Sequence, residues 1–163
     1  MKNYYDSIAE GYDSLHGEEQ LRKLSIIGQH IPKGALILDV GCGTGLSTIL
    51  GNVIGIDPSR GLLKKARIPV VQGMGEHLPF KDGCVDAVIC VTALHNFSDI
   101  EKGIKEMVRV SKGVIVVSLL RRSREYQTIR KVMGSVCRVD SIIEDSLDSI
   151  IVCNKKESGE KRQ

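Results

Sequence analysis

One stretch decides the fold of this chain: Leu36-Ile37-Leu38-Asp39-Val40-Gly41-Cys42-Gly43-Thr44-Gly45, an apolar run that ends in an acid and is followed by three alternating glycines. An apolar run such as Ala35 to Val40 is typical of a strand buried on both faces of a parallel sheet. The glycines allow the backbone to turn tightly and to approach a ligand where a Cβ would collide. A second apolar stretch, Val53 to Asp57, also ends in an acid, at a spacing that suits a carboxylate binding ribose hydroxyls.

Length and composition favour a single domain. The 163 residues, 42% of them hydrophobic, are enough for one ordinary core. We expect one domain over residues 1–154 and a flexible polar tail over residues 155–163, which show no periodicity. The net charge of +3 is too small to argue by itself for a nucleic-acid or membrane partner.

The cysteines and the apolar runs indicate a cellular compartment. The five cysteines include no C-x-x-C pair, so we expect free thiols in a reducing compartment, with no metal site. The longest apolar run, Val114 to Leu120, is too short to span a bilayer. With no signal peptide recognised, we expect a cytoplasmic protein.

Strand-like and helix-like segments alternate through the first two thirds of the chain. This order predicts a doubly wound, mostly parallel, seven-stranded α/β sheet of the Rossmann-like kind, closed by an antiparallel C-terminal hairpin. Ser98 to Glu101 is predicted to be a capping box that starts a helix with an apolar stripe. A further helix is expected over Glu18 to Ile31, and another after Pro58-Ser59. Strands are expected over residues 35–40, 53–57, 68–72 (at a sheet edge), 85–91, 114–119, 136–143 and 149–152.

The glycine spacing excludes two classes of nucleotide site. A dinucleotide fold needs G-x-G-x-x-G, whose last glycine allows close helix packing beside a pyrophosphate, but Leu46 stands at that position here. The chain also has no G-x-x-x-x-G-K-[ST], so nucleoside triphosphate chemistry is unsupported. The form G-x-G-x-G suits a ligand without a pyrophosphate.

These motifs, in this order, resemble the class I S-adenosylmethionine-dependent methyltransferases, in particular their small type 11 members. The resemblance covers about residues 4 to 120. It rests on the opening Y-D-x-I-A-x-x-Y-D, D-V-G-C-G-T-G, G-I-D-P-S, G-x-x-E-x-L-P-F and V-D-A-V-I-C-V-T-A-L-H-N-F-S-D, at residues 5–13, 39–45, 55–59, 73–80 and 85–99.

The resemblance implies S-adenosyl-L-methionine as cofactor and assigns its contacts. Asp39 would anchor the ammonium group, Asp57 would accept both ribose hydroxyls, and Gly75 and Glu76 would border the adenine. Met74 departs from the family, which often has an acid there for the adenine amino group. Read without the resemblance, Asp39 and Asp57 are a helix partner and a helix cap. The implied cofactor-binding residues are Asp39, Gly41, Cys42, Gly43, Asp57, Pro58, Gly75, Glu76, Thr92 and Tyr12.

Methyl transfer from a sulfonium is an in-line displacement, so alignment of the reactants is the main requirement. A general base is needed only if the acceptor must lose a proton, and His95 is the histidine best placed for that role. Asn96 and Tyr5 join it as candidate catalytic residues. The structural alternative is that His95 and Asn96 satisfy loop backbone groups. The opening segment, residues 3–13, is either a packed helix or a lid over the site.

The sequence leaves the acceptor open between a small molecule and RNA or protein of the translation apparatus. The alternative function is a cofactor-binding subunit that has no turnover of its own and works with a partner protein. An exposed edge strand at Ile68 to Val71 would pair with a small activator protein, as in some tRNA and translation-factor methyltransferases. Nucleic acid would contact a basic cluster after the fifth strand, although such clusters are more often solvated helix faces. This cluster contains Arg121, Arg122, Arg124, Arg130 and Lys131.

Overall fold

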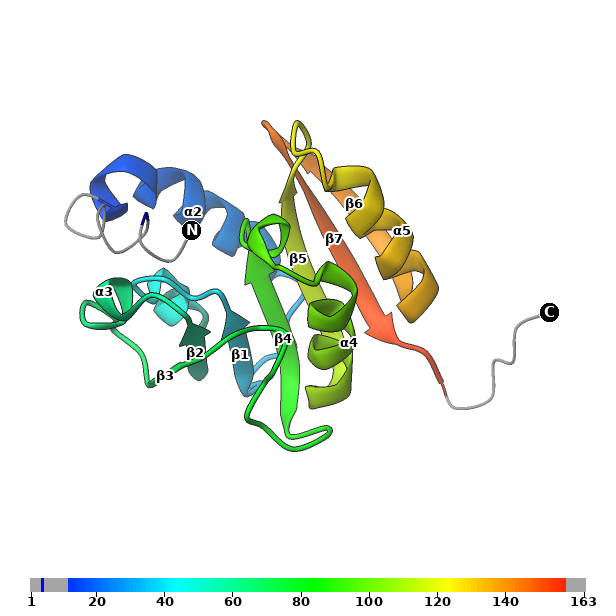
Figure 1. Cartoon of the computed structure of the whole chain (residues 1–163), viewed down its shortest axis with the longest axis horizontal. Helices are drawn as coiled ribbons and strands as arrows, with labels where there is room; N and C mark the ends of the chain where they lie inside the picture. The colour runs from blue at the N-terminus through cyan, green and yellow to red at the C-terminus, as the bar shows by residue number, and fades with distance from the viewer. Residues whose placement is uncertain (1–3, 5–11, 158–163) are drawn as a thin grey trace.

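The computed structural model describes residue 4 and residues 12–157, and within this part a seven-stranded sheet forms the centre of the molecule (Figure 1). The strand order is β3-β2-β1-β4-β5-β7-β6. The strands are β1 (Ile37–Val40), β2 (Val53–Asp57), β3 (Val70–Gln72), β4 (Val85–Val91), β5 (Ser111–Leu120), β6 (Cys137–Asp145) and β7 (Asp148–Lys155). The helices are α2 (Tyr12–Gly28), α3 (Arg60–Leu63), α4 (Ile100–Val110) and α5 (Tyr126–Val136), with short 3-10 helices at Leu46–Leu50 and Leu94–Asn96.

The pairing pattern confirms the predicted fold class. Strands β1 to β5 pair in parallel, whereas β7 pairs antiparallel with both β5 and β6. Asp39 pairs with Gly55 on one side and with Ile89 on the other, so the ends of β1, β2 and β4 meet at one edge of the sheet. This edge is where doubly wound sheets bind ligands.

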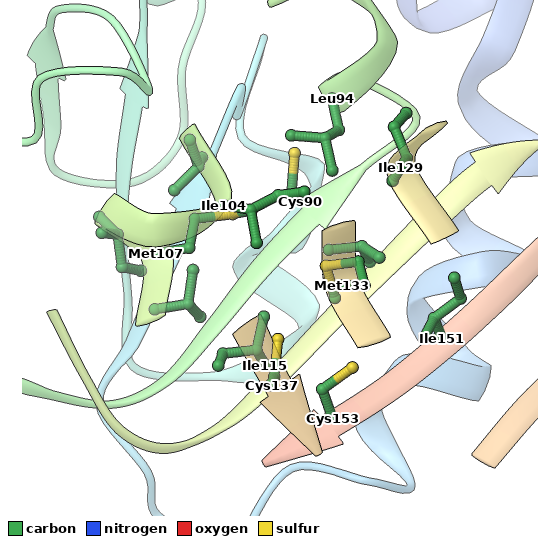
Figure 2. Close-up of a cluster of buried hydrophobic side chains, with 14 of the residues drawn as sticks. Cys90, Leu94, Ile104, Met107, Ile115, Ile129, Met133, Cys137, Ile151 and Cys153 are labelled. Carbon is green, nitrogen blue, oxygen red and sulfur yellow. The ribbon is translucent and has the colours of Figure 1, made fainter. Parts of the chain in front are cut away.

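Alternate residues of the central strands supply two core layers, one on each face of the sheet. On one face, Ile104 and Met107 of α4 and Ile129 and Met133 of α5 pack against the strands (Figure 2). On the other face, α2 packs through apolar side chains that include Leu24 and Ile27, both almost fully buried. Because both faces are covered, the strands read as continuous apolar runs in the sequence.

Several predicted boundaries were wrong. The first helix begins at Tyr12 and ends at Gly28, whereas the apolar stripe indicated residues 18–31. The capping box was also assigned to the wrong residue, because Asp99 caps α4 by accepting a hydrogen bond from the Lys102 backbone N–H at 2.9 Å. Ser98 binds Glu76 instead. The predicted tail beyond Glu157 lies outside the described residues.

Among residue 4 and residues 12–157, no helix is both long enough and apolar enough to cross a membrane.

Candidate active site

A cavity opens at the carboxyl edge of the sheet, where β1, β2 and β4 end. Its walls come from the glycine loop, the end of β2 with the start of α3, the loop after β3 and the turn after β4. The lining residues are Gly41, Gly43, Ile56, Asp57, Pro58, Ser59, Leu62, Gly73, Met74, Gly75, Glu76, Val91, Thr92, Ala93, Asn96 and Phe97.

Asp57 fixes the shape of the glycine loop from the end of β2. Its Oδ2 accepts a hydrogen bond from the Gly43 backbone N–H at 2.9 Å, and its Oδ1 accepts one from Ser59 N–H at 2.8 Å. Asp57 also lines the main cavity, so its carboxylate faces the space that a ligand would occupy. Asp57 is therefore both a structural anchor and a polar group of the cavity wall.

Asp39 lies at the end of β1, in a smaller hollow between the glycine loop and α2. The side chain is only 4% exposed. Oδ2 accepts a 2.6 Å hydrogen bond from Ser47, whereas the buried Oδ1 has no partner. Burial raises the pKa of Asp39 to about 7, an effect that Ser47 opposes and the nearby charge of Asp57 reinforces. A buried carboxylate with an unpaired oxygen has a high affinity for a cation.

The loop after β3 is fastened to the start of α4 by Glu76. The buried Oε1 of this residue accepts hydrogen bonds from the Ser98 backbone N–H at 2.8 Å and from the Ser98 hydroxyl at 2.9 Å. Gly75 lies so close to Phe97 that an added Cβ would come within 2.3 Å of the ring. Glu76 thus holds the cavity wall in place, and its carboxylate is occupied with backbone and hydroxyl donors.

The turn after β4 has a strained backbone at Thr92, whose φ of 51° lies in the left-handed region. A β-branched residue seldom adopts this conformation, which costs on the order of 1–3 kcal/mol. Hydrogen bonds hold it there: the Thr92 N–H donates to the backbone oxygen and the hydroxyl of Ser118, and the Thr92 hydroxyl accepts from Lys23 Nζ at 3.0 Å. The turn presses against the glycine loop, because a Cβ on Gly41 would meet the Ala93 Cβ at 2.6 Å.

His95 and Asn96 follow in the same turn. Asn96 lines the cavity, whereas His95 is half-buried beside it and is not one of the lining residues. Burial is the main cause that lowers the pKa of His95 below its ordinary value of 6.5; the charge of Lys23 also lowers it, whereas Glu125 and Asp148 raise it. His95 Nδ1 is buried and has no hydrogen-bond partner. The ring is therefore neutral at pH 7, the state that a general base requires.

The structure brings most of the candidate residues together. Gly41, Gly43, Asp57, Pro58, Gly75, Glu76, Thr92 and Asn96 line the main cavity, and Asp39 and Cys42 line the adjoining hollow. Tyr5 lies outside the described residues, and Tyr12 begins α2 with no described side-chain environment. Tyr4 alone of the first eleven residues is described, and it is exposed.

Some functional neighbours were not foreseen. Phe97 belongs to a motif that the resemblance covers, but no spacing rule indicates that its ring faces Gly75. Ser47 and Lys23 had no sequence signal, because their partners lie on other elements. Further unforeseen lining residues are Ile56, Leu62, Val91 and Ala93 in the main cavity, and Gln20, Leu24, Thr44 and Leu46 in the hollow.

Cysteine side chains can serve as reactive groups or as metal ligands. Burial is the main cause that raises the pKa of the Cys42 thiol far above its ordinary value, so this thiol is not a nucleophile at neutral pH. All five cysteines are free. Within the described part of the chain, no group of three or more His, Cys, Asp or Glu side chains is arranged to hold a metal ion.

The basic cluster lies on the segment from the end of β5 into α5. Arg121 pairs with Glu144 at 2.7 Å, and Arg130 packs over the ring of Tyr126 at 5.6 Å from its centroid. Arg122, Arg124 and Lys131 are exposed. The cluster is thus partly neutralised by the hairpin.

Comparisons with known proteins bear on the family of the chain. The family model for a methyltransferase domain matches residues 38–117. The Methanocaldococcus jannaschii protein MJ1252 is 36% identical in an alignment of 128 residues that covers 73% of this chain and 51% of that protein. The demethylmenaquinone methyltransferase of Lactiplantibacillus plantarum is 32% identical over 156 residues, covering 80% of this chain and 66% of the enzyme.

Solved structures share the fold at low sequence identity. A chain from the complex between the Haloferax volcanii Trm112 methyltransferase activator and a methyltransferase has a TM-score of 0.82 at 16% identity, covering 93% of this chain and 97% of that one. A Thermotoga maritima S-adenosylmethionine-dependent methyltransferase, described as a possible histamine N-methyltransferase, has a TM-score of 0.79 at 20% identity, covering 96% and 100%.

The fold is Rossmann-like, and the cavity lies at the carboxyl edge of the sheet, where doubly wound sheets bind ligands. The chain belongs to the class I S-adenosylmethionine-dependent methyltransferases, with a type 11 methyltransferase domain, and S-adenosylmethionine is the cofactor of this class. It spans between about half and two thirds of the length of the curated relatives that it matches.

Proposed function

We propose that this chain binds S-adenosylmethionine with its ammonium group on Asp39 and transfers the methyl group to an acceptor that must lose a proton. The observation that carries the proposal is the buried, unpaired Oδ1 of Asp39. A cation is the partner that a buried carboxylate oxygen requires, and the amino-acid end of this cofactor supplies one. The hollow around Asp39 adjoins the main cavity through Gly41, which lines both.

The remaining walls fit the nucleoside part of the cofactor. Asp57 lines the cavity at the end of β2, and a carboxylate there can accept hydrogen bonds from the ribose hydroxyls. At Gly41 and Gly75 the backbone borders the cavity where a Cβ would meet Ala93 or Phe97. With Met74 in place of an acid, packing and backbone groups hold the adenine.

The cofactor supplies a methyl group on a sulfonium, which is reactive without further activation. The chain's own task is to align the acceptor and to remove its proton. His95 is the base in this proposal for two reasons. Its ring is neutral at pH 7, and it lies next in sequence to Asn96, which lines the cavity. Asn96, which lines the cavity, orients the acceptor, and Tyr5 remains a candidate in the opening segment.

We propose a small molecule with an ionisable hydroxyl or enol as the acceptor. Two facts support this class: a base beside the cavity serves acceptors that must lose a proton, which include hydroxyls and enols, and several curated relatives are demethylmenaquinone methyltransferases. The basic cluster gives less support to nucleic acid, because Arg121 and Arg130 already have partners within the protein.

The deciding experiment follows labelled methyl groups from the cofactor into cell extract divided into small-molecule, RNA and protein fractions. Label in the small-molecule fraction, lost with His95→Gln while affinity for S-adenosylhomocysteine is kept, is the expected result. Cofactor binding without label in any fraction would favour the alternative of a binding subunit without turnover.

We also propose that the edge strand β3 binds a small activator protein of the Trm112 type. Among the strands that the structure describes, β3 pairs with β2 alone, and Val71 on it is 37% exposed. A structure of nearly the same extent has been solved in a complex with such an activator. An added strand would satisfy the open backbone groups of this edge.

A further inference from the structure

Three buried side-chain atoms in the described part of the chain have no hydrogen-bond partner: Asp39 Oδ1, His95 Nδ1 and Asp148 Oδ1. The proposed cofactor site accounts for the first of them. The other two are complementary, because an imidazole nitrogen can donate a hydrogen bond and a carboxylate oxygen can only accept one. Unpaired buried polar groups are rare, so two of opposite kind near one site call for a common explanation.

Asp148 is held rigidly by its other oxygen. It is the first residue of β7 and is fully buried. Its Oδ2 forms an ion pair with Lys23, a residue of α2 that is only 1% exposed, and lies 3.5 Å from the Thr92 hydroxyl. Lys23 in turn bonds Thr92 at 3.0 Å and Glu19 at 2.8 Å. This network fixes the carboxylate and leaves Oδ1 without a donor.

The same network lies beside His95. The Thr92 hydroxyl belongs to the turn that carries His95, three residues later. The charges that act on the ring come from three separate elements: Glu125 before α5, Asp148 on β7 and Lys23 on α2. Asp148 contacts the turn that carries His95 through the Thr92 hydroxyl, at 3.5 Å, and its charge raises the pKa of the ring, although no hydrogen bond joins Asp148 to His95.

We propose that Asp148 is a positioning residue for His95: its Oδ1 accepts the hydrogen of His95 Nδ1 when the site closes on its ligands. Hydrogen bonds of this kind often tighten only in the ligand complex. The bond fixes the tautomer that leaves Nε2 free to face the acceptor. This inference rests on the proposed function, since it gives His95 the orientation that its role as base requires.

The proton balance is simple. The acceptor's proton moves to His95 Nε2, the electron pair that it leaves forms the new bond to the methyl carbon, and the pair of the broken carbon–sulfur bond stays on sulfur. The resulting imidazolium is stabilised by the Asp148 carboxylate and then releases its proton to water.

The chain offers a matched pair of variants to test this arrangement. Asp148→Asn keeps the shape of the side chain but removes its charge, and Lys23 keeps Glu19 as a partner. Asp145→Asn is the control, because Asp145 also pairs with α2, through Arg22 at 3.1 Å, but on the surface. If Asp148→Asn does not fold, the double variant Lys23→Met/Asp148→Asn is measured in its place, because it leaves neither charge of the buried pair.

The measurement is the ¹⁵N spectrum of the His95 ring with S-adenosylhomocysteine bound, assigned by comparison with His95→Gln. Wild type and Asp145→Asn should show Nδ1 protonated and Nε2 bare at neutral pH. Asp148→Asn should move the ring toward the Nε2–H tautomer and lower the pKa of His95, because a charge that raises it is gone. Methyl transfer should fall at least about tenfold, with cofactor affinity changed less than about threefold.

A His95 tautomer that is the same in wild type and Asp148→Asn would overturn the inference, even if stability falls. It would also be overturned by an Nε2–H ring in the wild-type complex. These results leave the proposed function intact. If calorimetry detects no binding of S-adenosylhomocysteine to wild type, the proposed function is wrong, and this inference, which depends on it, is wrong as well.

Discussion

Asp39 is the residue at which stability and function conflict. The folded protein keeps the Asp39 proton up to about pH 7, whereas the unfolded chain releases it near 3.8. Between these values the folded state binds more protons, so its free energy of unfolding falls as pH rises. Asparagine does not ionise, so Asp39→Asn removes this pH-dependent loss of stability. At pH 8 we expect the variant to be more stable than wild type by roughly 1–3 kcal/mol in urea unfolding.

The same substitution should weaken ligand binding. Asparagine carries no charge for an ammonium group, so affinity for S-adenosylhomocysteine should fall about 10–100-fold by calorimetry. Wild-type affinity should rise with pH toward 7 as Asp39 ionises, whereas Asp39→Asn should show no such rise. Asp86→Asn serves as control, because Asp86 lies at the start of β4, away from the cavity, and its pKa is lowered by Lys112. Unchanged affinity in Asp39→Asn would contradict the proposed ammonium site.

At the scale of elements, the loop after β3 depends on one arginine of α4. Arg109 donates hydrogen bonds to the backbone oxygens of Phe80 at 2.8 Å and Leu78 at 3.0 Å, and it pairs with Glu106 at 2.6 Å. Glu106 also accepts from the Leu78 N–H at 2.8 Å. The helix thus holds the second half of the loop whose first half lines the cavity.

We expect Arg109→Met to destabilise the protein by about 1–3 kcal/mol, because it leaves two loop carbonyls without a donor and Glu106 without its cationic partner. Cofactor affinity should fall as well, since the loop forms a cavity wall. Lys112→Met is the matched control: Lys112 pairs with Asp86 at 2.8 Å on the surface, where such pairs contribute less than about 1 kcal/mol. Equal losses in the two variants, measured by urea unfolding, would rule out a specific role for Arg109.

Local patterns were sufficient for the strands and the glycine loop. β2 and β4 have the predicted bounds, and the cavity lies at the predicted edge, because apolar runs and glycine spacing are local signals. Lys23 shows the limit of such signals. From the sequence, where it lies beside other charged residues, a solvent-exposed side chain would be expected. In the structure Lys23 is buried and forms an ion pair with Asp148, the first residue of β7. Ser98 was misassigned for the same reason, because the competing acceptor, Glu76, lies in another loop.

At the scale of the whole molecule, the two edges of the sheet differ in their protection against pairing. β6 is long, but it carries charged residues such as Arg138 and Asp140 and has a register shift between Val139 and Ser141. Charges and irregularities of this kind discourage added strands. β3 has neither, and its three residues are partly or fully exposed. This asymmetry supports the proposal that β3, and not β6, binds the activator protein, although β3 is only three residues long.

This asymmetry leads to a prediction for the complete assembly. When the chain is coexpressed with a Trm112-type activator of the same organism, light scattering after size exclusion should show a 1:1 complex. Val71→Asp should abolish it, because a buried charge without a partner costs several kcal/mol at an interface. Leu147→Asp should not, although Leu147 is more exposed, at 53%, because it lies in the turn between β6 and β7, at the other edge of the sheet. A complex that survives Val71→Asp, or that Leu147→Asp breaks equally, would show that β3 is not the docking edge.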